Sequence, residues 1–301
     1  MVPAVQAAIV VGGLAYGSWA DWRRREVTDL LWIGMALAGT ALLLAILAPD
    51  GGRAVLLGVL VAALVLEHLV PWDAPLEALH PSLPGYVELA GYGIVLAVLL
   101  AAGVSYGVGP AGLPLEVIAV FVTVLLARAL FEVGLLYGGA DAKALMVAGL
   151  LLPLVTSPLI GVPASAALPL GVFPFSLTLL MNAALLAVAV PLALGARNAA
   201  RGEFEFPRGF TGFRIDVDEL PRRFVWLRDP TFNSSASQEE REVTTTEEDA
   251  ALRTRQRDEL RAQGLTRVWV TPQIPFVILL ALGALAGVVA GNLVYDLFAL
   301  V

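Results

Sequence analysis

The chain has no cysteine and few charged residues, and both shortages narrow the kinds of protein it can be. Without cysteine it has no disulfide, no thiol nucleophile and no cysteine-ligated zinc site. Charged residues make up 15% of its 301 residues, whereas soluble domains have roughly 25%. Only one of its 19 basic residues is lysine, Lys143. Because no basic stripe with interleaved aromatic residues occurs, nucleic acid is not expected as a partner.

Long apolar stretches are abundant instead, with 58% hydrophobic residues and a mean hydropathy of +0.80. A helix needs about 20 apolar residues to cross the hydrocarbon core of a bilayer. We therefore predict an all-α polytopic membrane protein with about eight transmembrane helices, set in the lipid bilayer of the plasma membrane. The predicted spans are roughly 3–20, 29–48, 54–70, 86–107, 115–137, 142–156, 173–195 and 274–298. The first lacks the positive n-region of a secretory signal, so we expect a permanent span.

The position of arginine predicts the orientation of these spans. Short cytoplasmic loops retain positive charge, and residues 23–25 are three arginines directly after the first span. The N-terminus is therefore expected outside the cell. An even number of predicted spans separates Asp21 from Asp141, so both carboxylates are expected at the cytoplasmic face.

Two further patterns concern the first span and the loop after it. Trp19, Trp22 and Trp32 cluster there, and indole rings favour the headgroup layer of a membrane. Gly13 and Gly17 are four residues apart, a spacing of small residues that permits close approach of another helix. We expect the three indoles at the interface and the two glycines in helix packing.

The sequence predicts three parts: a membrane-embedded core over 1–195, a cytoplasmic charged insert over 196–272 and a C-terminal transmembrane helix over 273–301. The insert carries 14 acidic residues and 13 arginines. A capping box from Thr245 to Glu248 predicts a solvated helix over about 246–263 that ends at Gly264. Residues 231–242 are expected to be flexible.

Two short segments carry the residues that favour catalysis: SWADWRRREVTDLLW at 18–32 and GGADAKAL at 138–145. Two carboxylates at one membrane face are the minimum equipment of an aspartic protease, in which one ionised group activates water and one protonated group polarises the peptide carbonyl. Proximity separates the two pKa values, because two nearby carboxylates do not both ionise cheaply. Gly138 and Gly139 are predicted to form a sharp turn that lets substrate backbone approach.

These motifs resemble those of a known family. Asp21, the arginines at 23–25, Val27-Thr28-Asp29 and Trp32 resemble the first catalytic motif of type IV prepilin peptidases, especially the archaeal preflagellin (prearchaellin) peptidases. The segment 138–143 resembles their GxGD motif, which presenilins and signal peptide peptidases share. The resemblance covers roughly 15–155. Two departures are Ala140, where glycine is common, and Thr28, where proline is common.

The resemblance implies a membrane aspartyl endopeptidase that removes the short basic leader of precursors for type IV pili or the archaellum. Asp21 and Asp141 match the two catalytic aspartates, and the cut is expected at the cytoplasmic membrane face. The implied partners are membrane-anchored precursors with a short charged leader and a hydrophobic helix. Neither a metal nor an organic cofactor is implied, and the oligomeric state is left open. Bacterial relatives often carry a cysteine-rich zinc segment, for which this chain gives no support.

Several neighbouring residues are candidates for lining this site. Lys143 is interpreted first as a membrane anchor whose ammonium group reaches the lipid headgroups, and second as a residue that orients the substrate. Asp29 is interpreted first as a helix cap and second as a residue of the site, and Arg25 as one of the topology anchors. The full set of site-lining candidates is Gly138, Gly139, Ala140, Lys143, Arg25 and Asp29.

Two alternative functions remain open at this point. One is a transporter or channel centred on four residues, of which Arg128 and Glu132 are one helical turn apart and expected to pair. The other two are Glu67 and His68, near the end of the third span. The second alternative is a non-enzymatic membrane scaffold whose charged insert recruits other proteins.

Overall fold

The structure is a computed structural model that describes residues 2–70, 80, 82–136, 138–154, 174–228 and 246–299. Two compact units make up the chain: Met1–Leu185 together with Phe276–Val301, and Leu186–Pro275. Each unit is held together by its own packed core.

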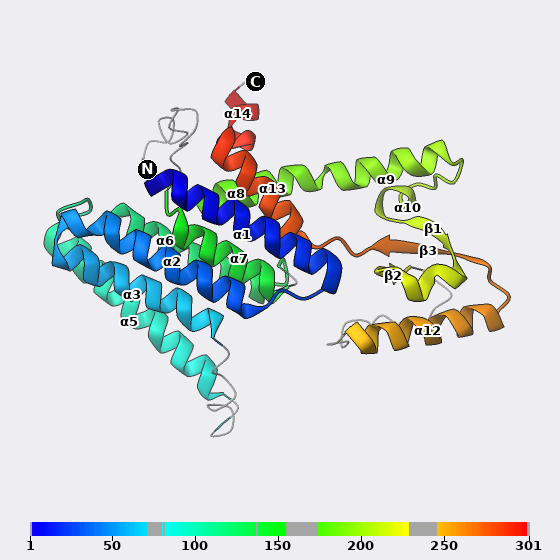
Figure 1. Cartoon of the computed structure of the whole chain (residues 1–301), viewed down its shortest axis with the longest axis horizontal. Coiled ribbons are helices and arrows are strands. Elements are labelled where there is room, and N and C mark those ends of the chain that lie inside the picture. The colour runs from blue at the N-terminus through cyan, green and yellow to red at the C-terminus, as the bar shows by residue number, and fades with distance from the viewer. Residues whose placement is uncertain are drawn as a thin grey trace. The chain divides into compact units, whose positions relative to one another are not determined.

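The described residues of the first unit are mainly helical (Figure 1). A helix occurs at the position of each of the eight predicted spans. The helices are α1 (Val2–Arg24), α2 (Asp29–Leu47), α3 (Gly52–Leu69), α5 (Leu83–Tyr106), α6 (Leu115–Glu132), α7 (Gly139–Leu151), α8 (Phe175–Ala187), α13 (Phe276–Val289) and α14 (Leu293–Ala299). A 3₁₀ turn, Ala48–Asp50, follows α2.

Four helical segments among the described residues are long and apolar enough to cross a membrane. They are Asp29–Asp50, Gly52–Leu69, Leu83–Tyr106 and Phe175–Ala200. This establishes a membrane protein rich in helices, while the count of eight spans stays a prediction.

Helix α7 is the centre of the first unit, because it packs on α1, α2, α3, α6 and α13. Nearly all of its residues are buried. Its small residues permit this close packing: a Cβ atom at Gly149 would lie 2.5 Å from the Thr123 side chain of α6. The helix is only 13 residues long. Its central position explains why a short apolar segment is stable here, since most of its surface contacts protein and little of it contacts lipid.

The glycines of α1 pack closely against other helices, as predicted. A Cβ atom at Gly13 would lie 2.3 Å from the sulfur of Met35 in α2. At Gly17 it would lie 3.2 Å from Trp32, whose indole is fully buried with an exposed fraction of 0%. The interfacial position predicted for Trp32 is therefore wrong: the space beside Gly17 accepts its ring inside the helix bundle. Trp19 and Trp22 are exposed.

The second unit combines helices with a small sheet that was not predicted. Its elements are α9 (Ala189–Ala200), α10 (Arg208–Thr211), β1 (Phe213–Asp216), a 3₁₀ helix (Val217–Arg222), β2 (Val225–Leu227), α12 (Thr246–Ala262) and β3 (Arg267–Pro272). The strands are antiparallel in the order β1-β3-β2 (Figure 1). Val268 and Val270 of β3 join a core cluster with Leu260 of α12, so α12 covers one face of the sheet.

Helix α12 confirms the helix predicted over about 246–263, and Gly264 beyond it has a positive φ of 78°. A left-handed residue is a common way to end a helix, and glycine adopts it without steric cost. The predicted capping box lies outside the described side chains, and the segment 231–242 lies outside the described residues.

Candidate active site

Asp21 lies in the last turn of α1 and is half-buried. The helix ends where Arg25 adopts a positive φ of 59°, and the Arg25 N–H donates to the Asp21 carbonyl oxygen over 2.9 Å. The C-terminal end of a helix carries partial negative charge and favours cations. Helix capping therefore does not explain a carboxylate at this position.

Asp141 lies in the first turn of α7, and its exposed fraction is 8%. Gly138 is the N-cap residue of this helix. The backbone N–H groups of Gly138 and Val277 hydrogen-bond to the Asp141 carboxylate. The bond from Gly138 follows the capping-box geometry, in which an acidic side chain reaches back to the N-cap N–H. The short loop at 138 and helix α13 together hold this carboxylate in place.

The two carboxylates lie just outside the apolar stretches predicted to span the membrane, and they are electrostatically coupled. Burial, and secondly the negative charge of Asp21, raise the pKa of Asp141 to about 7. Burial also raises the pKa of Asp21, while the nearby Arg25 guanidinium opposes this rise. Near neutral pH the pair therefore favours one shared proton, carried mainly by Asp141.

The two glycines of the motif do not form the predicted sharp turn. Gly138 has an ordinary extended backbone with φ of −101°, and Gly139 is the first residue of α7. The structure gives a different reason for glycine at position 138: a Cβ atom there would lie 3.0 Å from Oδ2 of Asp141. At Gly139 the space is open. Ala140 lies within the helix, where alanine is favourable, so the departure from the usual motif glycine causes no backbone conflict.

Lys143 forms an ion pair with Asp29, in which Nζ lies 2.5 Å from Oδ1. This contact joins α7 to α2 and links the two motifs. Thr28, and not Asp29, is the N-cap residue of α2, so the predicted capping role of Asp29 is wrong. Its side chain is directed to Lys143 instead, and a carboxylate in a first helical turn is also favoured by the helix dipole.

Helix α13 contributes to the site in a way that the sequence did not indicate. The Ser18 hydroxyl of α1 donates to the carbonyl oxygens of Leu14, over 2.7 Å, and of Val277, over 3.1 Å. Val277 also supplies an N–H to Asp141. Main-chain groups of Val277 therefore contact both α1 and α7. An apolar residue near the end of the chain carries no sequence signal for such a role, because its side chain takes no part in it.

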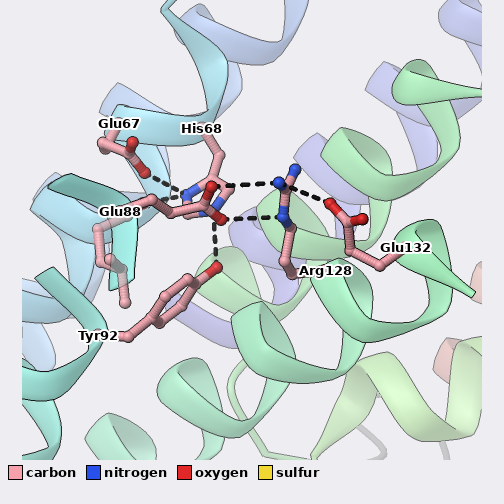
Figure 2. A network of polar contacts seen from close by, with 7 residues as sticks. Glu67, His68, Glu88, Tyr92, Arg128 and Glu132 are labelled. Atoms are coloured by element: carbon pink, nitrogen blue, oxygen red, sulfur yellow. Dashed lines mark hydrogen bonds and ion pairs between the residues drawn. The ribbon is translucent and has the colours of Figure 1, made fainter. Parts of the chain in front are cut away.

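A second polar cluster joins α3, α5 and α6 (Figure 2). Arg128 lies between two carboxylates: its Nε is 2.9 Å from Oε1 of Glu88, and one terminal nitrogen is 2.7 Å from Oε1 of Glu132. The contact between Arg128 and Glu132 confirms the predicted helical pair. Glu88 contacts Arg128 through both carboxylate oxygens, since its Oε2 also accepts a hydrogen bond from Arg128 over 3.1 Å.

His68 continues this cluster toward α5 (Figure 2). Its Nδ1 lies 2.8 Å from the Leu64 carbonyl oxygen and 2.7 Å from Oε2 of Glu67, so Nδ1 carries a proton. Its Nε2 lies 2.7 Å from the hydroxyl of Tyr92. Sequence reasoning missed Tyr92 and Glu88; an acid inside an otherwise apolar span was the available signal for Glu88.

The cluster holds three carboxylates, those of Glu67, Glu88 and Glu132, and each of them contacts either the Arg128 guanidinium or the His68 imidazole. In the part of the chain that the structure describes, no group of three or more His, Cys, Asp or Glu residues is arranged to hold a metal. Because its contacts join α3 to α5 and α5 to α6, the cluster has the character of a polar brace between three helices.

The site and fold define a membrane protein with two coupled carboxylates at helix ends. A model of the family described as archaeal peptidase A24 C-terminus, type II, matches residues 206–293. This match confirms the resemblance to the prepilin and preflagellin peptidase family, and it lies on residues outside both aspartate motifs. The matched family is described as a peptidase family. No curated protein shows a significant match to the chain.

Proposed function

We propose that this chain is a membrane aspartyl endopeptidase that cuts prepilin- or prearchaellin-type precursors behind their short basic leader, at the cytoplasmic membrane face. The observation that carries this proposal is the electrostatic coupling of Asp21 to Asp141, two residues that are 120 positions apart in sequence. Each lies in a motif that resembles a catalytic motif of the family. The family match over 206–293 supports a peptidase of this type independently of the motifs.

The different environments of the carboxylates assign their roles. Asp21 is less buried and has Arg25 beside it, so it is the group that ionises first and draws a proton from the attacking water. Asp141, with a pKa of about 7, keeps its proton near neutral pH and donates it to the oxygen of the peptide carbonyl. The C–N bond of the tetrahedral intermediate then breaks as Asp21 passes its proton to the leaving amine, and one hydroxyl of the intermediate returns a proton to Asp141 as the carbonyl group of the product forms.

The position of the carboxylates favours a peptide bond at the membrane surface as the substrate. Both lie at helix ends, next to apolar stretches that enter the bilayer. A precursor whose hydrophobic helix lies in the membrane presents the junction between leader and helix at this depth. The exposed indoles of Trp19 and Trp22 near Asp21 fit the headgroup layer and support this placement.

The test is cleavage by the purified full-length protein in detergent. The protein is incubated with a precursor that carries a short basic leader before a hydrophobic helix, and the products are mapped by mass spectrometry. A single cut between leader and helix supports the proposal. Cuts scattered within the hydrophobic helix would instead indicate general intramembrane proteolysis, and an intact precursor together with intact folded protein would contradict the proposal.

The transporter alternative is disfavoured by the pairing within the second cluster. Arg128 has two carboxylate partners, and His68 lies against Glu67 and Tyr92. A structural brace accounts for all of these contacts.

A further inference from the structure

The second unit contains a cavity that is separate from the aspartate motifs. Its volume is ≈ 230 Å³, below the roughly 300–1,000 Å³ of pockets that hold drug-sized ligands. Such a cavity suits one small polar group. It is lined by Arg208, Thr211, Gly212, Arg228, Trp269, Val270 and Thr271.

Two hydrogen-bonding side chains of β3 lack a partner at this cavity. Trp269 has an exposed fraction of only 6%, and its Nε1 finds no acceptor among the described residues. The buried hydroxyl of Thr271 is likewise unpaired within that part of the chain. Side chains alternate along a strand, and Val268 and Val270 enter the core below α12. Trp269 and Thr271 therefore project from the opposite face of the sheet. A buried unpaired donor is costly, so a ligand that accepts from it is favoured.

The charged residues in the described lining of the cavity are two arginines. Arg208 and Arg228 are exposed lining residues, and neither has a carboxylate partner among the described residues. Other arginines of this unit are paired: Arg214 lies 2.6 Å from Glu205, and Arg267 lies 2.6 Å from Glu203. Two guanidinium groups without a carboxylate partner among the described residues therefore lie at the same cavity as the two buried groups without a partner. Among the residues that the structure describes, the lining includes no acidic side chain.

Hydrogen bonds from several elements fix the walls. Nδ2 of the buried Asn198, in α9, donates to the carbonyl oxygens of Gly209, over 2.8 Å, and Gly212, over 2.7 Å. The Arg228 N–H donates to the Trp269 carbonyl oxygen over 2.9 Å. These bonds set the positions of the wall segments before any ligand enters, which lowers the ordering cost of binding.

We propose that this cavity binds a phosphate group, carried by an anionic lipid headgroup or by a soluble phosphate. Phosphate accepts several hydrogen bonds at once and pairs well with guanidinium groups. The lipid source is consistent with chain position, since the candidate span Phe175–Ala200 ends shortly before Arg208. With a lipid headgroup as the source, this site would bind the second unit to the membrane surface, and with either source it is independent of peptide cleavage.

The first experiment uses the full-length protein in a maltoside detergent, which contains no phosphate. Inorganic phosphate should raise its unfolding temperature more than chloride at equal ionic strength, because a ligand that binds only the folded state stabilises it. Arg208→Ala/Arg228→Ala should weaken the apparent affinity roughly tenfold or more. The charge-matched control is Arg201→Ala/Arg222→Ala, which alters two exposed arginines outside the lining and should keep the phosphate response.

Trp269→Phe tests the site without changing net charge. It removes the unpaired Nε1–H and keeps an aromatic ring. We expect the unfolding temperature without phosphate to be unchanged or higher, because a buried unpaired donor has gone, while the phosphate response falls several-fold. If this variant lowers the unfolding temperature without phosphate, Thr271→Val provides the same comparison at the second unpaired group.

A second arm identifies the source of the phosphate. Retention of phosphatidylglycerol and of diacylglycerol, which lacks phosphate, is compared by native mass spectrometry. Selective retention of phosphatidylglycerol that is lost in Arg208→Ala/Arg228→Ala assigns a lipid headgroup, and a response to inorganic phosphate alone assigns a soluble ligand. An equal loss in both double variants, or no response to either probe, overturns the proposal.

Discussion

Lys143 of α7 and Asp29 of α2 form an ion pair that links the two aspartate motifs, with 2.5 Å between Nζ and Oδ1. Both side chains are partly exposed, with exposed fractions of 24% and 40%. Solvent weakens such a pair, so its contribution to stability is small, about 0.2–1 kcal/mol. Its position suggests that it sets the distance between the start of α2 and the start of α7.

Separate Lys143→Met and Asp29→Asn variants should therefore each lower the free energy of unfolding by less than about 1 kcal/mol. The double variant should lose little more than either single variant, because both remove the same contact. Denaturant unfolding in detergent measures these changes. Fully additive losses would show that the pair does not couple the two helices in solution.

The pKa shifts predict a bell-shaped dependence of cleavage on pH. Activity should fall above about pH 7, where Asp141 loses its proton, and should fall again in acid, where Asp21 gains one. The measurement is kcat/KM across pH on the purified protein, with its fold checked at each pH. A rate that continued to rise through pH 9 would be incompatible with a protonated Asp141.

The same shift has a consequence for stability. A carboxyl whose pKa is raised on folding binds more protons in the folded state, so stability is greatest below its ordinary pKa of 3.8 and falls as the pH rises toward 7. Asp141→Asn should therefore unfold at a higher temperature than the parent chain at pH 8. The gain has an upper limit of roughly 4 kcal/mol, and the loss of contacts to backbone N–H groups reduces it. At pH 4 the difference should nearly vanish.

Gly138 and Gly139 offer a matched pair of substitutions in one motif. Gly138→Ala places a Cβ atom 3.0 Å from Oδ2 of Asp141 and displaces the carboxylate, whereas Gly139→Ala meets nothing within 4 Å. We expect cleavage to fall at least about tenfold in the first variant, because catalysis depends closely on geometry, and to be largely retained in the second. Single-turnover rates distinguish the two. Equal rates for both variants would remove the role assigned to Gly138.

The cluster around Arg128 should act on stability and not on chemistry. Arg128→Met leaves Glu88 without its cation and should cost roughly 1–3 kcal/mol, while Glu132→Gln removes a more exposed partner and should cost less. Cleavage per folded molecule should be unchanged in both. The transporter reading would be favoured instead if the parent chain carried a substrate into proteoliposomes and both variants, although folded, did not.

Much of the helical framework could be predicted, because apolar stretches of sufficient length have few other stable structures in a membrane. The helix after residue 246 could also be predicted from local signals. The sheet could not: β1 and β2 have four and three residues, and within the described part of the chain each pairs with β3, which follows much later in the sequence. Strands this short give little alternation of polar and apolar residues.

In the candidate site, too, some features could be predicted from the sequence and others depend on how the helices pack. The motifs at Asp21 and Asp141 are visible in sequence because their residue types are unusual next to apolar spans. The pairing of Lys143 with Asp29 and the contact from Val277 depend on which helices become neighbours, and nothing local to these residues determines that. Trp32 was misplaced for the same reason, since the space beside Gly17 is visible only once α1 and α2 are packed.

The most direct test of the central claim compares cleavage by the parent chain with cleavage by separate Asp21→Asn and Asp141→Asn variants, each purified in detergent and shown to be folded. Asparagine keeps the shape of the side chain and removes its acid–base chemistry. We predict that each variant loses at least about 10²-fold in the rate of leader removal. Cleavage at the parental rate by either folded variant would contradict catalysis by this pair of carboxylates.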